Sequence, residues 1–164
     1  MEKGGISVST ENIFPVIKHW LYSDKDIFVR EVVSNSCDAI TKHKRLVSLG
    51  EAKESSSDYR IDIKLDKENR TITFTDSGIG MTGEEVKLYI NQIALSGALD
   101  FISKYEGENS TNNGSGIIGH FGLGFYSVFM VADTVEMNTK SHTGEKAVHW
   151  ECNEAGEFSM TEGE

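Results

Sequence analysis

The sequence predicts an α/β (α+β) two-layer sandwich, in which a mostly antiparallel, mixed sheet is covered on one face by helices. Two observations favour this class. Helical spacing of apolar residues dominates the first part of the chain, and alternating apolar and polar residues dominate its last part. Segregated helices and strands are typical of helices packed on one face of an antiparallel sheet. With 164 residues and no internal repeat or interdomain linker, one domain is expected over residues 1–164.

The first expected elements are a short strand and two helices. Ile6–Val8 is expected as an edge strand, and the apolar spacing within Ser9–Tyr22 is helical. Ser23 has the character of a helix N-cap, with Asp26 at the third position after it. A second helix is therefore expected to run from this cap to about Leu46.

A β-hairpin is expected next, after the small, charged and serine-rich loop Gly50–Asp58. Apolar and polar residues alternate from Arg60 to Leu65, and they alternate again around Ile72 and Phe74. The polar stretch Lys67–Arg70 between these runs supplies the turn.

Two helical pieces and a loop are expected after the hairpin. Thr82 and Glu85 form a capping box for a helix whose apolar positions continue to Ile93. A shorter helix is expected over Leu99–Tyr105. Gly107–Gly116 contains no apolar residue, so it is expected to be a mobile loop.

The remaining elements are one short helix and three strands. The nearly all-apolar run Phe125–Val131 predicts the helix. Strands are expected over Thr134–Thr139 and Ala147–Cys152, joined by a turn that contains Gly144, and a further strand is expected over Glu157–Thr161.

Charge and composition exclude several classes of function. The formal net charge is −10 at pH 7, whereas contacts to duplex phosphates require an excess of lysine and arginine, so no nucleic-acid partner is expected. No apolar run has the length of a signal peptide or a membrane span, so a cytoplasmic domain without membrane contact is expected. Cys37 and Cys152 are too few and too far apart to indicate a disulfide framework or a zinc site.

The helix around REVVSNSCDA carries the first candidate site residues. At about 100° per residue, Glu31, Asn35, Asp38 and Lys42 share one stripe, with an apolar side opposite. A solvated helix face is the simpler explanation, but asparagine is a poor helix former that such a face does not need. The Asn35 amide oxygen suits Mg²⁺, which takes few protein ligands beside substrate phosphates. Glu31, one turn away, is placed to deprotonate an attacking water.

The segment DSGIGM follows the second strand of the predicted hairpin. Asp76 at this point is commonly only part of a turn. The functional alternative is a carboxylate on a pocket floor that accepts from the exocyclic amine of adenine and rejects guanine, which presents a carbonyl there. Gly80 then allows close approach of the backbone to the base, and Met81 supplies apolar contact.

The segment GHFGLG, residues Gly119–Gly124, precedes an apolar helical run. Glycines expose amide donors, and a helix start attracts anions, so this segment is a candidate phosphate site. A flexible turn is the more frequent explanation for such a run. The motif GxxxxGK[ST] does not occur in the chain, and GHFGLG does not fit GxGxxG. A metal role is not expected for His120, because no second ligand lies at a suitable spacing.

With these three segments in this order, the chain resembles the amino-terminal ATP-binding domain of the HtpG chaperones, a bacterial heat-shock family within the GHKL ATPase superfamily. The similar parts run from TENIFPVIKHWLYSDKDIFVREVVSNSCDA through DSGIGMT and GHFGLGFYSVFMVAD to HWECN. YSDKDIFVRE and FGLGFYS are the most distinctive. Type II topoisomerases, mismatch-repair ATPases and sensor kinases share only the outline of the pattern.

The resemblance implies a role for each candidate residue and a layered sandwich fold. Glu31 becomes the water-activating base, Asn35 the Mg²⁺ ligand, and Asp76 the adenine reader, with Gly80 and Met81 lining the base pocket. Further nucleotide contacts are implied near the pocket mouth and around the phosphates, from Asp38, Lys42, Gly119, His120, Phe121, Gly122, Leu123, Gly124 and Phe125. The implied ligands are ATP or ADP with Mg²⁺, and a lid would run from about Ile93 to Gly119.

Three departures from the family pattern bear on these expectations. Leu95 stands where many relatives carry a lysine or arginine, and His120 stands where glutamine is usual. Family domains also continue with another strand carrying Gly-Thr, so a chain ending at Glu164 is expected to be a partial domain.

Two classes of function remain open at this point. One is the ATPase module of a chaperone that acts on unfolded client proteins and works as a homodimer when full length. The other is a nucleotide-binding regulatory module with negligible turnover. Another GHKL ATPase, of the topoisomerase or mismatch-repair type, ranks below both.

Overall fold

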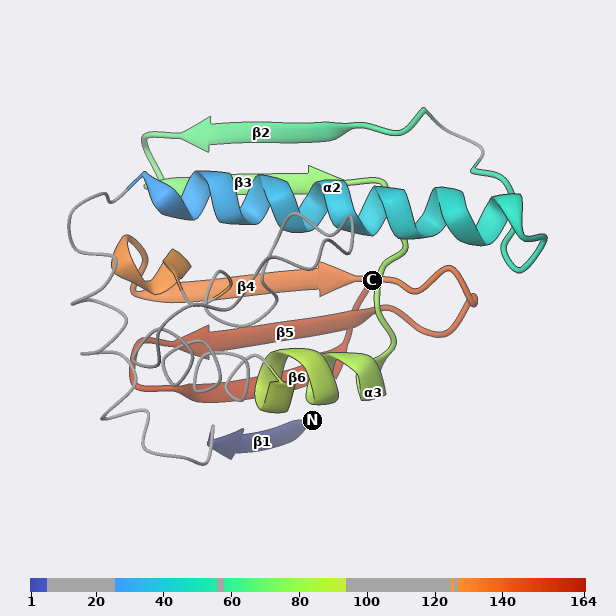
Figure 1. The fold of residues 1–164 in the computed structure, drawn as a ribbon. Coiled ribbons are helices and arrows are strands. Elements are labelled where there is room, and N and C mark those ends of the chain that lie inside the picture. Colours follow the sequence, from blue (N-terminus) through green and yellow to red (C-terminus); the bar gives the residue numbers. More distant parts are fainter. Residues whose placement is uncertain (6–25, 56–57, 94–124, 126) are drawn as a thin grey trace, which may run out of the picture.

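The fold is taken from a computed structural model, which describes residues 1–5, 26–55, 58–93, 125 and 127–164 (Figure 1). The described part consists of six strands and four helical segments. In chain order these are β1 (Glu2–Gly5), α2 (Ile27–Ser48), β2 (Ile61–Asp66), β3 (Thr71–Asp76), α3 (Gly83–Glu85), the π-helix η1 (Val86–Ile93), the 3₁₀ helix η2 (Ser127–Met130), β4 (Thr134–Thr139), β5 (Val148–Asn153) and β6 (Glu157–Glu162).

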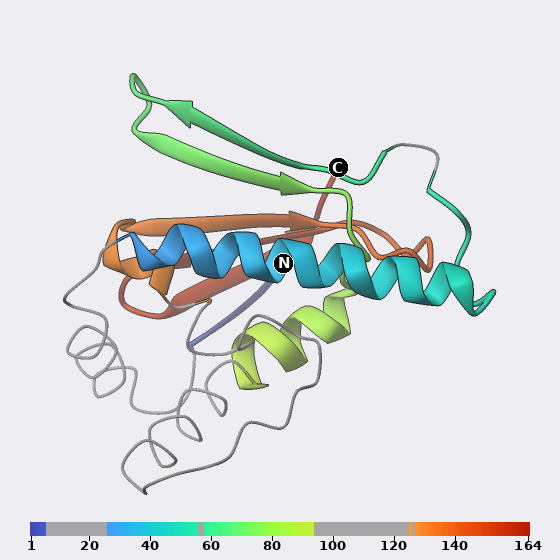
Figure 2. The same ribbon diagram turned by 45° about the horizontal axis from the view of Figure 1, so that its top comes forward.

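The described strands form two sheets, and every pairing within them is antiparallel. β1, β6, β5 and β4 form a four-stranded sheet in that order, while β2 and β3 form a separate hairpin. Figure 2 shows the hairpin standing apart from the larger sheet, with α2 running alongside. The antiparallel architecture with helices on the sheets is as predicted. The difference is that the described strands form two sheets: no pairing joins β3 to β4, and it is the loop after β3 that contacts the end of β4, where the Met81 amide donates to Thr139 Oγ1.

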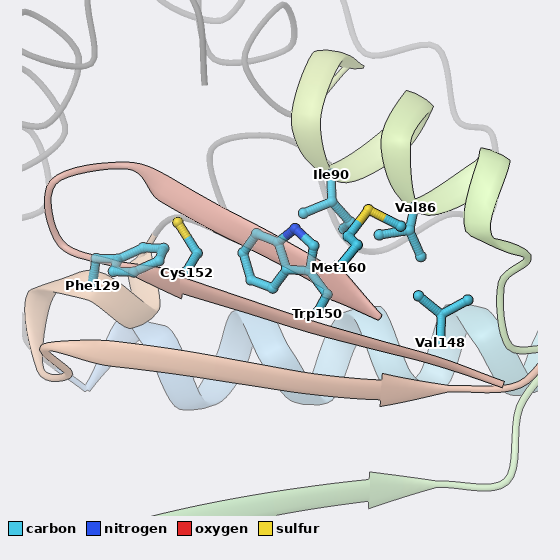
Figure 3. Close-up of a cluster of buried hydrophobic side chains, with 7 residues drawn as sticks. All are labelled: Val86, Ile90, Phe129, Val148, Trp150, Cys152 and Met160. Carbon is cyan, nitrogen blue, oxygen red and sulfur yellow. The ribbon is translucent and has the colours of Figure 1, made fainter. Parts of the chain in front are cut away.

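The core lies on one face of the four-stranded sheet, under η1 and η2 (Figure 3). Along β5 the buried side chains alternate with more exposed ones, as a strand with one covered face requires. Trp150 at the centre of this face is fully buried, and the Phe125 ring meets its ring edge-on with centroids 5.7 Å apart. The other core side chains are Val86, Ile90, Phe129, Val148, Cys152 and Met160.

Burial in this core also determines the chemistry of one cysteine. Cys152 is fully buried, and burial raises the pKa of its thiol to about 11. Desolvation disfavours the thiolate, so this side chain behaves as a small apolar residue at neutral pH.

α2 forms the second layer by packing on the hairpin. The Phe28 ring meets the Phe74 ring edge-on, with centroids 6.4 Å apart. Further along the helix, the carbonyl of Ala39 accepts a hydrogen bond of 3.1 Å from the amide of Ile79, just beyond the end of β3. The helix is thereby fixed to the second half of β3 and to the loop that follows it. Within the described residues, no helix is long and apolar enough to cross a membrane.

Several predicted elements are confirmed. β2 and β3 pair around the predicted turn, with Ile63 opposite Phe74, and β4 has the predicted bounds. β5 and β6 follow as expected, and Gly144 in the turn between β4 and β5 has φ +82°. The capping box is also present: the Glu85 amide donates to Thr82 Oγ1 (3.2 Å), and the Thr82 amide donates to Glu85 Oε2 (2.8 Å).

The long helix runs slightly past its predicted end at about Leu46, and its predicted cap, Ser23, lies outside the described residues. It begins at Ile27 and continues to Ser48, past Leu46. Asp26 is the N-cap residue, but its φ of −75° and ψ of −9° are already helical, and its side chain makes no capping hydrogen bond. Beyond Leu46 the last turn is supported by Ser48, whose Oγ donates to the Arg45 carbonyl at 2.7 Å.

Two other predicted helices differ in their winding. The helix after Thr82 is α-helical only through Glu85 and continues as the π-helix η1. The apolar run Phe125–Val131 contains the 3₁₀ helix η2, and the Val131 amide donates to the Val128 carbonyl at 3.2 Å, a 3₁₀-type bond. A strand is present at Glu2–Gly5. The predictions for Ile6–Val8, Ser9–Tyr22, Ser23, Leu99–Tyr105 and Gly107–Gly116 lie outside the described residues.

Truncating the central core residue is expected to destabilise the fold strongly. Trp150→Ala should lower the free energy of unfolding by about 3–5 kcal/mol, because it removes a large buried ring and leaves a cavity. Glu151→Ala, at the next residue on the exposed face of β5, is the matched control and should change stability by less than about 0.5 kcal/mol. Urea denaturation measures both. Equal effects would contradict the placement of Trp150 at the centre of the core.

Candidate functional site

α2 carries the predicted stripe of polar residues, but the stripe is not a solvated face. Asp38 is only 3% exposed, whereas Lys42, one turn later, is exposed. The Glu31 side chain is 20% exposed, and its Oε1 lies 3.5 Å from Arg30 Nη2. Aspartate is rarely buried to this degree unless it serves a purpose in the site or the fold. The simpler explanation of a solvated face therefore fails in the middle of the stripe.

Asn35 carries a buried amide oxygen whose hydrogen-bonding capacity is not used by any of the described residues. Its Oδ1 is the one buried side-chain nitrogen or oxygen without a hydrogen-bond partner in the part of the chain that the structure describes. A buried polar atom without a partner costs about 1–3 kcal/mol, so it points to a missing water, ion or ligand. Among the described residues no three His, Cys, Asp or Glu side chains are grouped to hold a metal ion. A single amide oxygen fits Mg²⁺, which keeps several waters and substrate phosphates as ligands.

The loop after β3 docks directly on α2, one turn beyond Asn35. A Cβ atom on Gly78 would lie 2.6 Å from the Cβ of Ala39, so a larger residue does not fit. The Ile79 amide, next in the chain, donates to the Ala39 carbonyl. The structure therefore brings the DSGIGM segment against the helix that carries the Asn35 stripe.

Asp76 lies at the end of β3 and is exposed. Its Oδ1 accepts a hydrogen bond of 2.9 Å from the Gly78 amide, which is the turn geometry expected of a strand-end aspartate. In the part of the chain that the structure describes, Asp76 is an exposed residue. It borders a hollow of about 630 Å³ lined by Ser55, Asp58, Arg60, Asp62, Thr75, Asp76 and Ser77.

Gly80 and Met81 are held by the end of β4. Gly80 has φ +65°, and a Cβ atom there would lie 1.9 Å from the Lys140 carbonyl oxygen. Packing against this backbone therefore requires a glycine, independently of any approach to a base. The Met81 amide donates to Thr139 Oγ1 at 3.0 Å, and its side chain packs against the core.

Of the third predicted segment, GHFGLG with the Phe125 that follows it, the structure describes only Phe125. Gly119, His120, Phe121, Gly122, Leu123 and Gly124 lie outside the described residues. Phe125 is described, and its side chain packs on Trp150 in the core.

Sequence reasoning missed a ring cluster beside the docked loop. His43 on α2 is 8% exposed, and its Nδ1 lies 2.7 Å from Tyr59 Oη. The His142 ring, from the turn between β4 and β5, meets the His43 ring with centroids 6.3 Å apart. Lys44 Nζ lies 4.9 Å from the centre of the Tyr59 ring. The only sequence signal is that His43 lies two turns after Asn35 on the same helix, and this spacing does not predict partners from distant segments.

Comparisons with known proteins agree with this geometry. The family described as "Histidine kinase-, DNA gyrase B-, and HSP90-like ATPase" matches residues 22–160. The chain is 53% identical to the chaperone protein HtpG of Bacteroides thetaiotaomicron over 99% of its own length, and 49% identical to HtpG of Porphyromonas gingivalis over 97%. It is 41% identical over 99% of its length to the mitochondrial TNF receptor-associated protein 1 homolog of Dictyostelium discoideum.

The chain spans only 23% of the length of each of these relatives. The family match itself covers most of the chain and includes both the Asn35 helix and the Asp76 loop. The resemblance drawn from the motifs is thereby confirmed, and the chain belongs to the histidine kinase-, DNA gyrase B- and HSP90-like ATPases.

Proposed function

We propose that the chain is the ATP-binding and ATP-hydrolysing part of an HtpG-type chaperone. The observation that carries this proposal is the buried, unpartnered Oδ1 of Asn35, one helical turn from the site where the Gly78 loop docks. The whole protein would act on unfolded client proteins as a homodimer in the cytoplasm. Action on client proteins rests on the similarity to proteins named as chaperones, whereas the homodimer and the cytoplasmic location are carried over from the family resemblance alone.

The base of the nucleotide is proposed to lie at the Asp76 loop. The Asp76 carboxylate is exposed and accepts one hydrogen bond through Oδ1, which leaves Oδ2 to accept from the exocyclic amine of adenine. Guanine presents a carbonyl at that position, and two acceptors facing one another repel. Met81, partly buried against the core, supplies apolar contact beside the base.

The phosphates are proposed to lie along the α2 stripe, with Mg²⁺ held by Asn35. Bound Mg²⁺ would neutralise phosphate charge, with Asn35 Oδ1 as its protein ligand. Lys42, the last residue of the stripe, is exposed and provides a positive charge for the phosphates. Asp38 lies between Asn35 and Lys42 on the helix.

Glu31 is proposed as the general base. It lies one turn before Asn35, so a water held near the phosphates is within reach of the same helix face. Its side chain is mostly buried, at 20% exposure, and its neighbour is the exposed Arg30 guanidinium. A carboxylate in this position orients the attacking water and takes its proton in the transition state.

Removing the adenine-reading charge should weaken binding selectively. Asp76→Asn is expected to lower ADP affinity roughly tenfold or more, because the adenine amine would face a mismatched amide. The fold should be kept, since an asparagine oxygen still accepts from the Gly78 amide. Calorimetric titration with ADP and GDP measures the change. Asp62→Asn, which borders the same hollow, is the control and should bind ADP as the parent chain does. Unchanged ADP affinity in folded Asp76→Asn would refute the assignment.

Removing the base should affect rate rather than binding. Glu31→Gln is expected to keep ATP affinity while the hydrolysis rate falls by about 10²–10⁴-fold, because a general base acts in the transition state. Single-turnover hydrolysis and ATP titration separate the two effects. Glu151→Gln, on the exposed face of β5, is the control for a lost surface carboxylate. If Glu31→Gln hydrolyses ATP at the parent rate, Glu31 is not the base.

Asn35→Ala should change stability and binding in opposite directions. Alanine removes a buried oxygen without a partner and raises helix propensity, so the free energy of unfolding should rise by about 0.5 kcal/mol or more. ADP affinity should fall in Mg²⁺ but stay unchanged in excess EDTA. Thermal unfolding and titration under both conditions measure this pair of effects. A variant that is destabilised and binds ADP normally in Mg²⁺ would give Asn35 a purely structural role.

A further inference from the structure

The Gly78–Met81 loop is held from two sides by elements that are distant in the sequence. On one side, the Ile79 amide donates to the Ala39 carbonyl of α2. On the other side, the Ile79 carbonyl accepts a hydrogen bond of 2.9 Å from the His142 amide, in the turn between β4 and β5. A single residue of the loop thus bridges the helix and the turn. Figure 1 shows the chain leaving β3 and passing the end of β4 on its way to α3.

Thr139, the last residue of β4, makes the side-chain contact of this arrangement. Its Oγ1 accepts the Met81 amide at 3.0 Å, and its side chain is half-buried. Gly80, between the two bonded residues, lies against the Lys140 carbonyl, where no side chain fits. The loop is therefore fixed on both sides of its left-handed glycine.

The turn that follows Thr139 is itself well ordered by internal bonds. Ser141 is 5% exposed, and its Oγ accepts from the Thr143 amide at 3.3 Å and from Thr143 Oγ1 at 3.0 Å. The Gly144 amide donates to the Ser141 carbonyl at 3.1 Å. The ring of His142, in this turn, also contacts the ring of His43 on α2, so the turn is in contact with the helix as well as with the loop. These bonds hold the turn in one conformation, so that it can support the Gly78–Met81 loop, to which it is bonded through the His142 amide.

We infer that Thr139, together with the turn of residues 140–144, positions the Gly78–Met81 loop, and with it the proposed adenine site, against α2. The inference rests on the proposed function, in which Asp76 and Met81 contact the base. Thr139 is a positioning residue: its hydroxyl oxygen is engaged by the Met81 amide, and it acts on the nucleotide through the loop. The turn therefore influences affinity for adenine and its preference over guanine, although it belongs to none of the three sequence segments that predict the site.

The test replaces the hydroxyl of Thr139 while keeping the shape of the side chain. Thr139→Val leaves the Met81 amide without its acceptor, and ADP affinity should fall roughly fivefold to tenfold, with a smaller preference for ADP over GDP. Thr139→Ser restores the acceptor and should bind ADP within about twofold of the parent chain. Thr134→Val, at the exposed start of the same strand, is the matched control and should leave both affinities unchanged.

Two readouts keep this role distinct from a loss of stability and from the proposed function itself. Thermal unfolding of each variant identifies a general destabilisation, which would lower ADP and GDP binding equally. Amide hydrogen exchange of Met81 in the nucleotide-free parent chain should show protection, whether or not Thr139→Val folds. An unprotected Met81 amide, or equal ADP binding by Thr139→Val and Thr134→Val, overturns the positioning role alone. A parent chain that binds ADP no better than GDP refutes the proposed function, and the inference with it.

Discussion

The close docking of a glycine turn against a helix is the constraint on which the rest of the site depends. Gly78 meets Ala39 so closely that a Cβ atom would clash, and Gly80 meets the Lys140 backbone in the same way. These two contacts fix where the end of β3 lies relative to α2. Asn35 and Asp76 are 41 positions apart in the chain, and this docking brings the helix that carries Asn35 against the loop that follows Asp76. A bulkier residue at either glycine would separate the two halves of the site.

The local elements could be predicted from the sequence, because each is specified by neighbouring residues. Alternation specifies the β2–β3 hairpin and β4 to β6, and the Thr82 and Glu85 side chains specify a helix start. The π winding of η1 could not be predicted, because the apolar spacing that predicts a helix there, with Val86 and Ile90 in the core, does not distinguish π from α winding. No local pattern records such packing.

The division of the described strands into two sheets also depends on tertiary contacts that no local sequence pattern records. Alternation along β3 and β4 predicts that each is a strand but not which strand it pairs with, because pairing partners are chosen by tertiary contacts. The burial of Asp38 and the ring cluster at His43 likewise require three segments to be in place at once. The candidate site was therefore predictable in its residue types and spacing, but the supports around it were not.

The different environments of the two cysteines make the chain suited to site-specific labelling. Cys152 is enclosed in the core, with a thiol that stays protonated near neutral pH. Cys37 is only half-buried and lies on α2, two residues after Asn35 and one before Asp38. A small thiol-reactive fluorophore or spin label would thus be directed to the helix that carries the site, without any cysteine being removed. A label on Cys37 would lie within one helical turn of Asn35 and Asp38 and could report on nucleotide binding there.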